Sequence, residues 1–305
     1  MTRADAIHFL LKFPVKFGKM LGFTKLGDLH NEWMKSMINA EDDETLQAHR
    51  GSYKTTCVSI VLALIIILMP NKRTLFMRKT DTDVKEVIRQ VQKILKDPHT
   101  QYFVKVIYGC KLKLTVESAN EVSTNLTTDI KGTSQLVGLG LGSSLTGKHF
   151  DFIFTDDIVN INDRTSKAER ERTKIMYQEL LNVKNRGGRM FNTGTPWHKD
   201  DAFALMPNPK KFDCYSTGLI SEEELERIRS SMIASLFAAN YELRHIASED
   251  VIFDRPKTGA ETEKVLNGTD HVDAAYGGDI SGFVPEFVAE KIFNKFNMDA
   301  EVYPS

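Results

Sequence analysis

The sequence predicts an α/β fold in which a mostly parallel β-sheet is flanked by helices. Strand-like and helical segments alternate from residue 58 to residue 198, an order typical of parallel sheets because each parallel strand needs a long crossover connection. Two predicted strands also end in polar residues, FTDD and NTGT. Ligands of open α/β sheets bind beyond the carboxyl ends of the strands, so we expect the site there.

Each predicted element follows from its own pattern. Residues 58–69 are almost all apolar, which indicates a helix buried inside the protein, and Pro70 ends it. A short strand follows over 73–79, and apolar residues recur at helical spacing over 81–95. The remaining segments are a strand over 111–116, a glycine-rich loop over 135–147, a strand over 149–157, a charged amphipathic helix over 166–183 and a strand over 189–198.

Length and composition limit the class of protein. A chain of 305 residues has room for one large domain, or for one domain and part of a second, and 41% apolar residues are enough for a sizeable core. The 40 basic and 41 acidic residues give a net charge of −1, which argues against nucleic-acid binding through bulk charge. Three scattered cysteines predict neither a disulfide framework nor a zinc site. The longest apolar run, CVSIVLALIIILM, is too short to span a membrane, so we expect a soluble protein of a reducing cytosol.

The stretch HRGSYKTT has the chemistry of a phosphate-binding loop. Such a loop wraps backbone N–H groups around a phosphate at a helix N-terminus, with a lysine at the β/γ-phosphates and a hydroxyl on Mg²⁺. Lys54 and Thr55 supply those groups, and Gly51 allows a tight turn. The general pattern G-x-x-x-x-G-K-[ST] is not met, because Ala48 and Tyr53 occupy its glycine positions. Taken alone, the stretch is equally well interpreted as a lysine at the start of a buried helix.

A second motif decides between these interpretations. The hydrophobic strand FDFIFTDD ends in Asp156 and Asp157, well after Lys54 in the chain. The first carboxylate can hold Mg²⁺ through its water shell, and the second can orient or deprotonate an attacking water. Two acids after a core strand are otherwise an ordinary surface turn. Because the lysine loop and the carboxylate strand occur in the expected chain order, we predict a phosphate site.

Five segments in the same order resemble the large terminase subunit of tailed bacteriophages, an ATPase and nuclease that packages DNA into procapsids. HRGSYKTT is similar to the family's divergent phosphate loop, HFDFIFTDD to its magnesium strand and NTGTPWH to its third motif, which couples hydrolysis to movement. FAANYELRHIASEDVIF resembles the connector after the ATPase domain, and HVDAAYGGD resembles the start of an RNase H-like nuclease. The resemblance covers most of the chain. It implies a P-loop NTPase fold of the ASCE/RecA-like class.

The resemblance also implies roles for individual residues. Arg50 stands where the family has an arginine that stabilises charge on the γ-phosphate from within the same chain, and we expect it to be catalytic together with Asp157. Many family members have glutamate at the position of Asp157, so its shorter side chain departs from the family's general base. The implied ATP-binding residues are Arg50, Gly51, Ser52, Tyr53, Lys54, Thr55 and Thr56, the Mg²⁺ ligands are Asp156 and Thr55, and the coupling residues are Thr193, Gly194 and Thr195.

The domain organisation follows from the same resemblance. Asp273 and Asp279 are the candidate Mg²⁺ or Mn²⁺ ligands of the nuclease. A two-metal nuclease needs three or four carboxylates, and the residues after Asp279 are too few for such a domain. We therefore expect a nuclease segment that is truncated or internally deleted relative to the family, with doubtful endonuclease activity. The expected boundaries are an ATPase domain over 1–215 with a helical lead-in over 1–45, a helical connector over 216–266 and an incomplete nuclease segment over 267–305.

These features predict an ATP-hydrolysing motor subunit of a phage or prophage terminase, which drives DNA into procapsids. Its implied partners are double-stranded DNA, the portal protein and the small terminase subunit, with no membrane. We expect a homo-oligomeric ring on the portal, in the cytoplasm of the bacterial host. Two alternatives stay open: another helicase-like P-loop ATPase, for which further strand-separation motifs are missing, and a non-catalytic prophage remnant. ATP turnover and procapsid-dependent DNA translocation distinguish the three.

Overall fold

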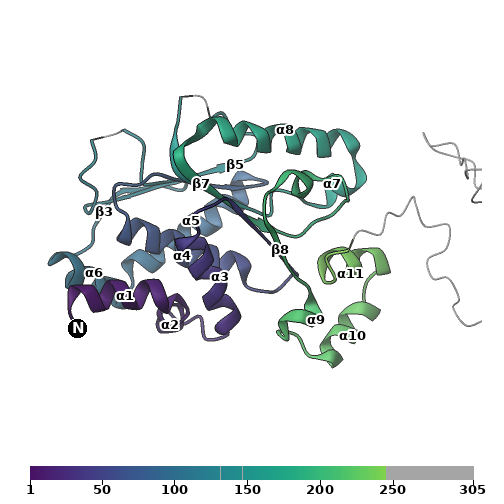
Figure 1. The fold of residues 1–305 in the computed structure, drawn as a ribbon, viewed down its shortest axis with the longest axis horizontal. Coiled ribbons are helices and arrows are strands. Elements are labelled where there is room, and N and C mark those ends of the chain that lie inside the picture. Colours follow the sequence, from purple (N-terminus) through teal and green to yellow (C-terminus); the bar gives the residue numbers. More distant parts are fainter. Residues whose placement is uncertain (131, 146, 245–305) are drawn as a thin grey trace, which may run out of the picture. The chain divides into compact units, whose positions relative to one another are not determined.

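A sheet of eight strands forms the centre of residues 1–130, 132–145 and 147–244, the part of the chain that the computed structural model describes (Figure 1). The strand order is β3-β4-β5-β2-β6-β7-β1-β8. Neighbours from β5 to β8 run parallel, whereas β4 is antiparallel to both β3 and β5. The predicted α/β class with a mostly parallel sheet is thus confirmed. The strands are β1 (Glu44–Ala48), β2 (Thr74–Arg78), β3 (Leu114–Glu117), β4 (Glu121–Thr124), β5 (Leu136–Gly140), β6 (Phe150–Asp156), β7 (Lys184–Gly194) and β8 (Pro209–Phe212).

Helices flank both faces of this sheet. The first six lie on one face, α7 and α8 lie on the other, and α9, α10 and α11 follow the last strand (Figure 1). Among the described helices, none combines the length and hydrophobicity of a membrane-spanning segment. The helices are α1 (Arg3–Lys12), α2 (Pro14–Met20), α3 (Asp28–Asn39), α4 (Lys54–Leu68), α5 (Asp81–Lys96), α6 (Pro98–Tyr108), α7 (Ile161–Thr165), α8 (Lys167–Val183), α9 (Cys214–Thr217), α10 (Glu222–Ser230) and α11 (Ala234–Asn240), with a 3-10 turn η1 at Ala202–Leu205.

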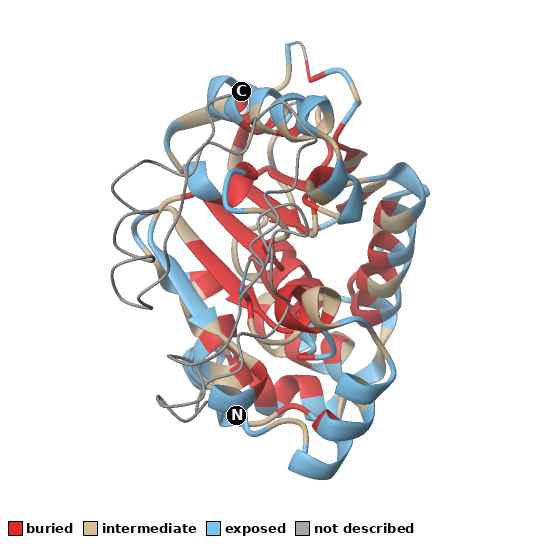
Figure 2. Cartoon of the chain, turned by 90° about the vertical axis from the view of Figure 1, so that its right-hand side faces the viewer, coloured by how far each residue is buried: buried red, intermediate tan, exposed pale blue. Residues whose placement is uncertain are grey.

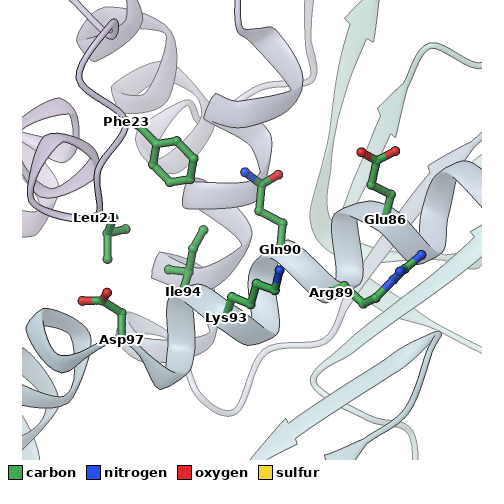
Figure 3. A pocket seen from close by; sticks show the side chains of 8 residues that line it. All are labelled: Leu21, Phe23, Glu86, Arg89, Gln90, Lys93, Ile94 and Asp97. Atoms are coloured by element: carbon green, nitrogen blue, oxygen red, sulfur yellow. The ribbon is translucent and has the colours of Figure 1, made fainter.

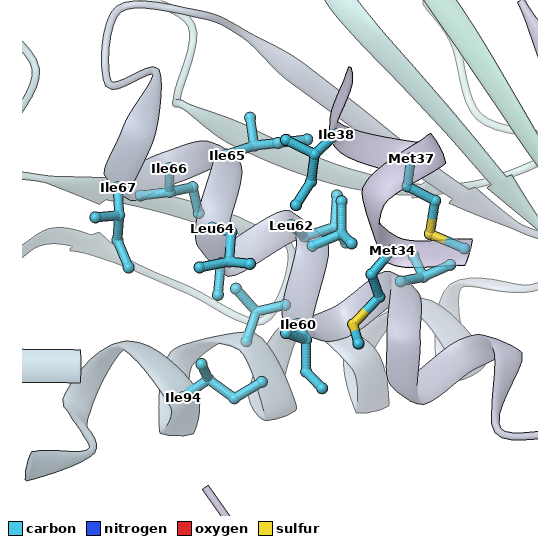
Figure 4. Packing of buried hydrophobic residues seen from close by; sticks show 14 of the residues in the cluster. Met34, Met37, Ile38, Ile60, Leu62, Leu64, Ile65, Ile66, Ile67 and Ile94 are labelled. Carbon is cyan, nitrogen blue, oxygen red and sulfur yellow. The ribbon is translucent and has the colours of Figure 1, made fainter. Parts of the chain in front are cut away.

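Alternation of side chains along the strands divides the buried residues into two cores. In β2, Phe76 belongs to the core shared with α1, α3, α4, α5 and α6, whereas Leu75 and Met77 belong to the core shared with α8. Figure 2 shows buried residues concentrated along the strands and the helix surfaces turned toward them. The apolar helix predicted over 58–69 is α4, which lies between α3 and α5 and is buried almost all round (Figure 4). Each such buried leucine or isoleucine stabilises the fold by roughly 1.5–3 kcal/mol.

The glycine-rich segment was predicted as a loop, and this is wrong for Leu136–Gly140, which forms β5 inside the sheet. The glycines are needed because α5 packs directly against this strand. A Cβ atom at Gly138 would lie 2.5 Å from Cγ1 of Val84 and 2.9 Å from Cδ1 of Ile88. Where a helix packs this closely against a strand, side chains do not fit on that face of the strand, and glycine takes their place. The sequence pattern of such a strand resembles that of a glycine-rich loop.

Gly138→Val therefore tests the close approach of α5 to β5. Overpacking at this contact should destabilise the protein by about 1–3 kcal/mol, because either the strand or the helix must move. Urea unfolding measures the difference. Gly142→Val is the matched control, since the nearest atom to a Cβ there is a flexible end of Arg172 at 3.5 Å. Equal stability of the two variants would contradict the packing argument.

The other predicted elements agree with the structure apart from their ends. β7 begins at Lys184, before the predicted start at 189, and it ends at Gly194. Several elements were not predicted, among them β1, β4, β8, α6 and α7. The expected domain boundaries at 215 and 266 stay predictions, and residues 245–305 lie outside the described part of the chain.

Candidate functional site

The predicted site residues meet at the carboxyl edge of the sheet. The loop that joins β1 to α4 lies beside the ends of β6 and β7, where Asp156 is in register with Thr193. A pocket of about 500 Å³ opens there. Its lining includes every residue from Arg50 to Thr56 together with Asp157 and Thr195. Segments far apart in the sequence thus contribute to one pocket.

The loop between β1 and α4 turns through two left-handed residues, although tyrosine stands where a glycine was expected before the lysine. Tyr53 occupies the position before the lysine with φ 60°, and Gly51 has φ 82°, so both residues are left-handed. This conformation costs an ordinary residue roughly 1–2 kcal/mol. The ring of Tyr53 packs against the ring of His30, with centroids 6.0 Å apart. The first N–H groups of α4 begin directly after this turn, which favours an anion in the pocket.

Lys54 is the first residue of α4, and its ammonium group lies beside the carboxylate of Asp157, the residue that follows β6. The residue is only 7% exposed, and Nζ lies 3.6 Å from Oδ1 of Asp157. Because Lys54 also lines the pocket, its charge faces both the carboxylate and the space above the loop. The interpretation of this lysine as a simple helix start does not explain that position.

Asp156 is completely buried, and three side chains contact its carboxylate. Thr55 Oγ1 donates a hydrogen bond to Oδ2 at 2.9 Å, and Thr193 Oγ1 donates to Oδ1 at 2.6 Å. The guanidinium Nε of Arg78 lies 3.2 Å from Oδ2. Burial, and then the charge of Asp157, raise the pKa of Asp156, while Arg78 and Lys54 oppose that rise. Thr55 of α4, Thr193 of β7 and Arg78 of β2 therefore meet at a single carboxylate at the end of β6.

Asp157 lies one residue beyond β6 and turns toward the pocket. Its φ of 49° is left-handed, and its N–H donates to the carbonyl of Thr193 at 3.0 Å. Its side chain is 34% exposed. Gly194 has φ 155°, and a Cβ atom there would lie 3.2 Å from Oδ1 of Asp157 and 2.9 Å from Phe203. Gly194 therefore leaves room for this carboxylate.

Arg78 is a site residue that the sequence analysis missed. It ends β2, and its Nη2 lies 3.3 Å from Oδ2 of Asp157 in addition to the contact of Nε with Asp156. The sequence placed this arginine at the end of a predicted strand, but gave no sign that β2 lies next to β6. Knowledge that β2 and β6 are neighbouring strands would have identified Arg78 as a site residue.

Two buried histidines also support the loop and were not predicted. Nδ1 of His30 accepts a hydrogen bond from the N–H of Gly27 at 2.9 Å, so Nε2 carries the proton donated to the carbonyl of Ser52 at 3.1 Å. Nδ1 of His49 donates to the carbonyl of Arg50 at 2.9 Å, and Nε2 lies 2.8 Å from the hydroxyl of Thr217. Burial lowers the pKa of both imidazoles. Neutral histidines thus hold the loop through hydrogen bonds to the carbonyls of Ser52 and Arg50.

The remaining predicted residues differ in their placement. The N–H of Arg50 donates to the carbonyl of Asn240 in α11 at 2.8 Å, and its side chain is exposed beside the pocket. Thr195 donates to the carbonyl of Ala48 at 3.3 Å and does not contact the carboxylates that Thr193 reaches. The nuclease candidates Asp273 and Asp279 lie outside the described residues.

The donor set suits a hard cation such as Mg²⁺ only in part. The hydroxyl of Thr55 and the carboxylate of Asp156 lie together, and oxygen ligands are those that Mg²⁺ prefers. Within the described residues, no group of three or more His, Cys, Asp or Glu side chains could hold a metal ion. Mg²⁺ usually keeps several waters and binds through one or two protein groups plus substrate phosphates, so this pair fits an ion that arrives with a nucleotide.

A second pocket of about 480 Å³ lies away from these residues, between α5 and the turn after α2 (Figure 3). Leu21, Phe23 and Ile94 supply its apolar side chains, and Arg89 and Lys93 are the cations along α5. None of the predicted site residues lines it.

Comparisons with known proteins find similar solved structures and no matching family. No protein-family model matches the chain, and neither does any curated protein. Among solved structures, the chain is similar to the large terminase ATPase domain of Thermus phage P74-26, with a TM-score of 0.46 and 10% identity over 68% of this chain and 90% of that one. It is similar to the large terminase of bacteriophage HK97 (TM-score 0.46, 11% identity, 72% of this chain, 50% of that one) and to a DEAD box protein from Methanococcus jannaschii (TM-score 0.37, 14% identity, 67% and 56%). The chain thus spans about half the length of the HK97 protein. Likeness at this level of identity concerns the fold alone.

Proposed function

We propose that this chain is an ATP-hydrolysing motor subunit of a terminase that packages double-stranded DNA. The observation that supports this proposal is that Lys54, Thr55 and Asp157 line one pocket, and that Thr55 also donates a hydrogen bond to the buried carboxylate of Asp156 in β6. A lysine, a hydroxyl and a buried carboxylate at a helix N-terminus are the groups that bind a nucleoside triphosphate and Mg²⁺.

In the proposed mechanism the loop amides and Lys54 bind the β- and γ-phosphates. Thr55 and Asp156 would hold Mg²⁺, which supplies positive charge on the phosphate oxygens when it is bound. Asp157 faces the same pocket and would orient the attacking water or accept its proton. Arg50, exposed beside the pocket in the same chain, would stabilise charge on the γ-phosphate.

The coupling motif would transmit the state of the nucleotide. Thr193 donates to Asp156, and Thr195 donates to the carbonyl of Ala48 just before the loop. A shift of the Asp156 carboxylate would therefore act on β7 through Thr193, and a shift of β7 would act on the end of β1 through Thr195. We propose that this movement drives DNA toward a procapsid in a ring of subunits on the portal, with the small terminase subunit as a further partner, in the cytoplasm of the bacterial host. The proposed division is an ATPase domain over 1–215 and a connector over 216–266.

DNA-dependent ATP hydrolysis by the purified protein tests this function. We expect Mg²⁺-dependent turnover that rises with double-stranded DNA and with portal-bearing procapsids. Nucleotide binding without turnover would favour the non-catalytic remnant instead. Turnover coupled to strand separation, measured with a labelled duplex, would favour the helicase-like alternative. The nuclease at Asp273 and Asp279 stays a prediction, which plasmid cleavage in Mn²⁺ tests separately.

Tyr53 permits a prediction about the loop itself. Tyr53→Gly should keep the affinity for ATP within a few-fold of the parent, because glycine adopts the left-handed conformation without strain. Tyr53→Val should weaken binding by tenfold or more if the loop deforms, since a β-branched residue at positive φ is disfavoured by sterics. Calorimetric titration with ADP measures both. Equal affinities for the two variants would show that this conformation does not matter for binding.

A further inference from the structure

The guanidinium of Arg78 contacts both carboxylates at the end of β6. Nε lies 3.2 Å from Asp156 and Nη2 lies 3.3 Å from Asp157. Its side chain is 16% exposed. The arginine does not line the phosphate-loop pocket, whereas Asp157 and Lys54 do. Arg78 therefore contacts Asp157, which lines the pocket, without lining the pocket itself.

The backbone of this arginine is fixed on both sides. Arg78 is in register with Gly140 of β5, and its carbonyl accepts a hydrogen bond from the N–H of Leu141 at 2.9 Å. The preceding residue, Met77, is in register with Thr155 in β6. Because the backbone of Arg78 is held in this way, its side chain extends from a fixed point toward the carboxylates of Asp156 and Asp157. A planar guanidinium that contacts both carboxylates also restricts the distance between them.

The charges of the site make this arginine necessary. Asp156 and Asp157 are adjacent anions, and the cations within 4 Å of them are Lys54 and Arg78. A bound triphosphate would attract the ammonium of Lys54, which lines the pocket. The neighbouring Lys79 cannot take its place, since Nζ lies 3.0 Å from the buried carboxylate of Asp163. Arg78 then remains as the cation that holds the pair.

We propose that Arg78 is a positioning residue for hydrolysis, which keeps the carboxylate of Asp157 directed into the pocket while Lys54 binds phosphate. This inference rests on the proposed ATPase function. It differs from a phosphate-contacting arginine, which would have to line the pocket. Arg78 acts on the water through Asp157, so its loss should affect the rate of the chemical step more than the affinity for nucleotide.

The first experiment compares Arg78→Ala and Arg78→Lys with the parent in steady-state ATP hydrolysis and calorimetric binding of ADP and ATP-γ-S. We expect kcat to fall on the order of 10–100-fold in Arg78→Ala, less than for loss of a general base, with both affinities within about threefold. Arg78→Lys should recover part of the rate, because lysine restores the positive charge but cannot contact both carboxylates as the planar guanidinium does. Arg227→Ala, an exposed arginine of α10, is the matched control and should behave as the parent. Selective loss of ATP-γ-S affinity would overturn the proposal in favour of a direct phosphate contact.

The second experiment asks whether Arg78 acts through Asp157. In the Asp157→Asn background, removal of Arg78 should lower kcat by less than about twofold, whereas independent roles would multiply the two losses. The same four proteins give a test without turnover. Arg78→Ala should lower the Tm of the nucleotide-free protein, and the added Asp157→Asn should recover part of it, because one uncompensated charge is removed. An inactive parent would contradict the proposed function, whereas additive effects on Tm would contradict the role of Arg78.

Discussion

We expect Lys54→Ala to reduce ATP hydrolysis to the background rate while the protein stays folded. The ammonium of Lys54 lies at the start of α4 and 3.6 Å from Asp157, facing the pocket. In P-loop proteins this charge cradles the β- and γ-phosphates, where the transition state gathers negative charge. Its removal should weaken ATP binding and lower kcat together, which steady-state hydrolysis and calorimetry with ATP-γ-S measure.

The control for this experiment is Lys85→Ala, an exposed lysine on α5. It removes the same charge away from the pocket and should hydrolyse ATP at the parent rate. Circular dichroism of both variants verifies that the fold is kept. Hydrolysis by Lys54→Ala at the parent rate would show that the loop is not a phosphate site, and would return the lysine to the role of a helix start.

Asp156 permits a related prediction, for which asparagine is a better substitution than alanine. Its buried carboxylate accepts hydrogen bonds from Thr55 and Thr193 and contacts Arg78. Alanine would leave these donors buried without a partner, at a cost of about 1–3 kcal/mol for each group. Asp156→Asn keeps the shape and one acceptor oxygen. We expect it to stay folded and to lose the Mg²⁺ dependence of nucleotide binding along with turnover.

The outline of the fold could be predicted because the strongest local sequence patterns predict the same helices and strands that the sheet contains. The apolar run that became α4 fits only the inside of a protein, and the carboxylate strand carries its own signal in the alternation of FDFIF. β1 escaped prediction because ETLQA is half polar, although all but the first of its residues are buried in the sheet. Its partners β7 and β8 follow far later in the chain, so the burial of Thr45 and Gln47 is a tertiary effect.

The site was predictable where its chemistry lies in motifs and was not where it depends on strand order. Lys54, Thr55 and Asp156 were named because a loop and a strand end carry recognisable residue types. Arg78 and His30 lie in segments without a motif. They join the site because β2 is the neighbour of β6 and because α3 lies against the loop. Tyr53 was correctly seen as a departure from the pattern, and the left-handed turn that glycine usually provides is formed nevertheless.

Asp157→Asn is the substitution that separates chemistry from binding. The carboxylate of Asp157 faces the pocket with 34% of its side chain exposed, and its backbone N–H is fixed by the carbonyl of Thr193. Asparagine keeps the size and can accept a hydrogen bond from water, but it cannot take a proton. We therefore expect nucleotide affinity close to that of the parent and a loss of rate on the order of 10²–10⁴-fold, the range typical of a general base.

Asp157→Glu is the informative partner of this variant, because a longer carboxylate restores the charge at a different reach. The room for it is limited by Gly194, where a Cβ atom would already lie 3.2 Å from Oδ1 of Asp157. If the carboxylate acts on a water, the glutamate should recover part of the rate with a changed pH profile, whereas a purely structural role would leave the pH profile of kcat unaltered. A parallel fall of affinity and rate in Asp157→Asn would place the residue among the metal or phosphate ligands, and the water-orienting role would then have to be given up.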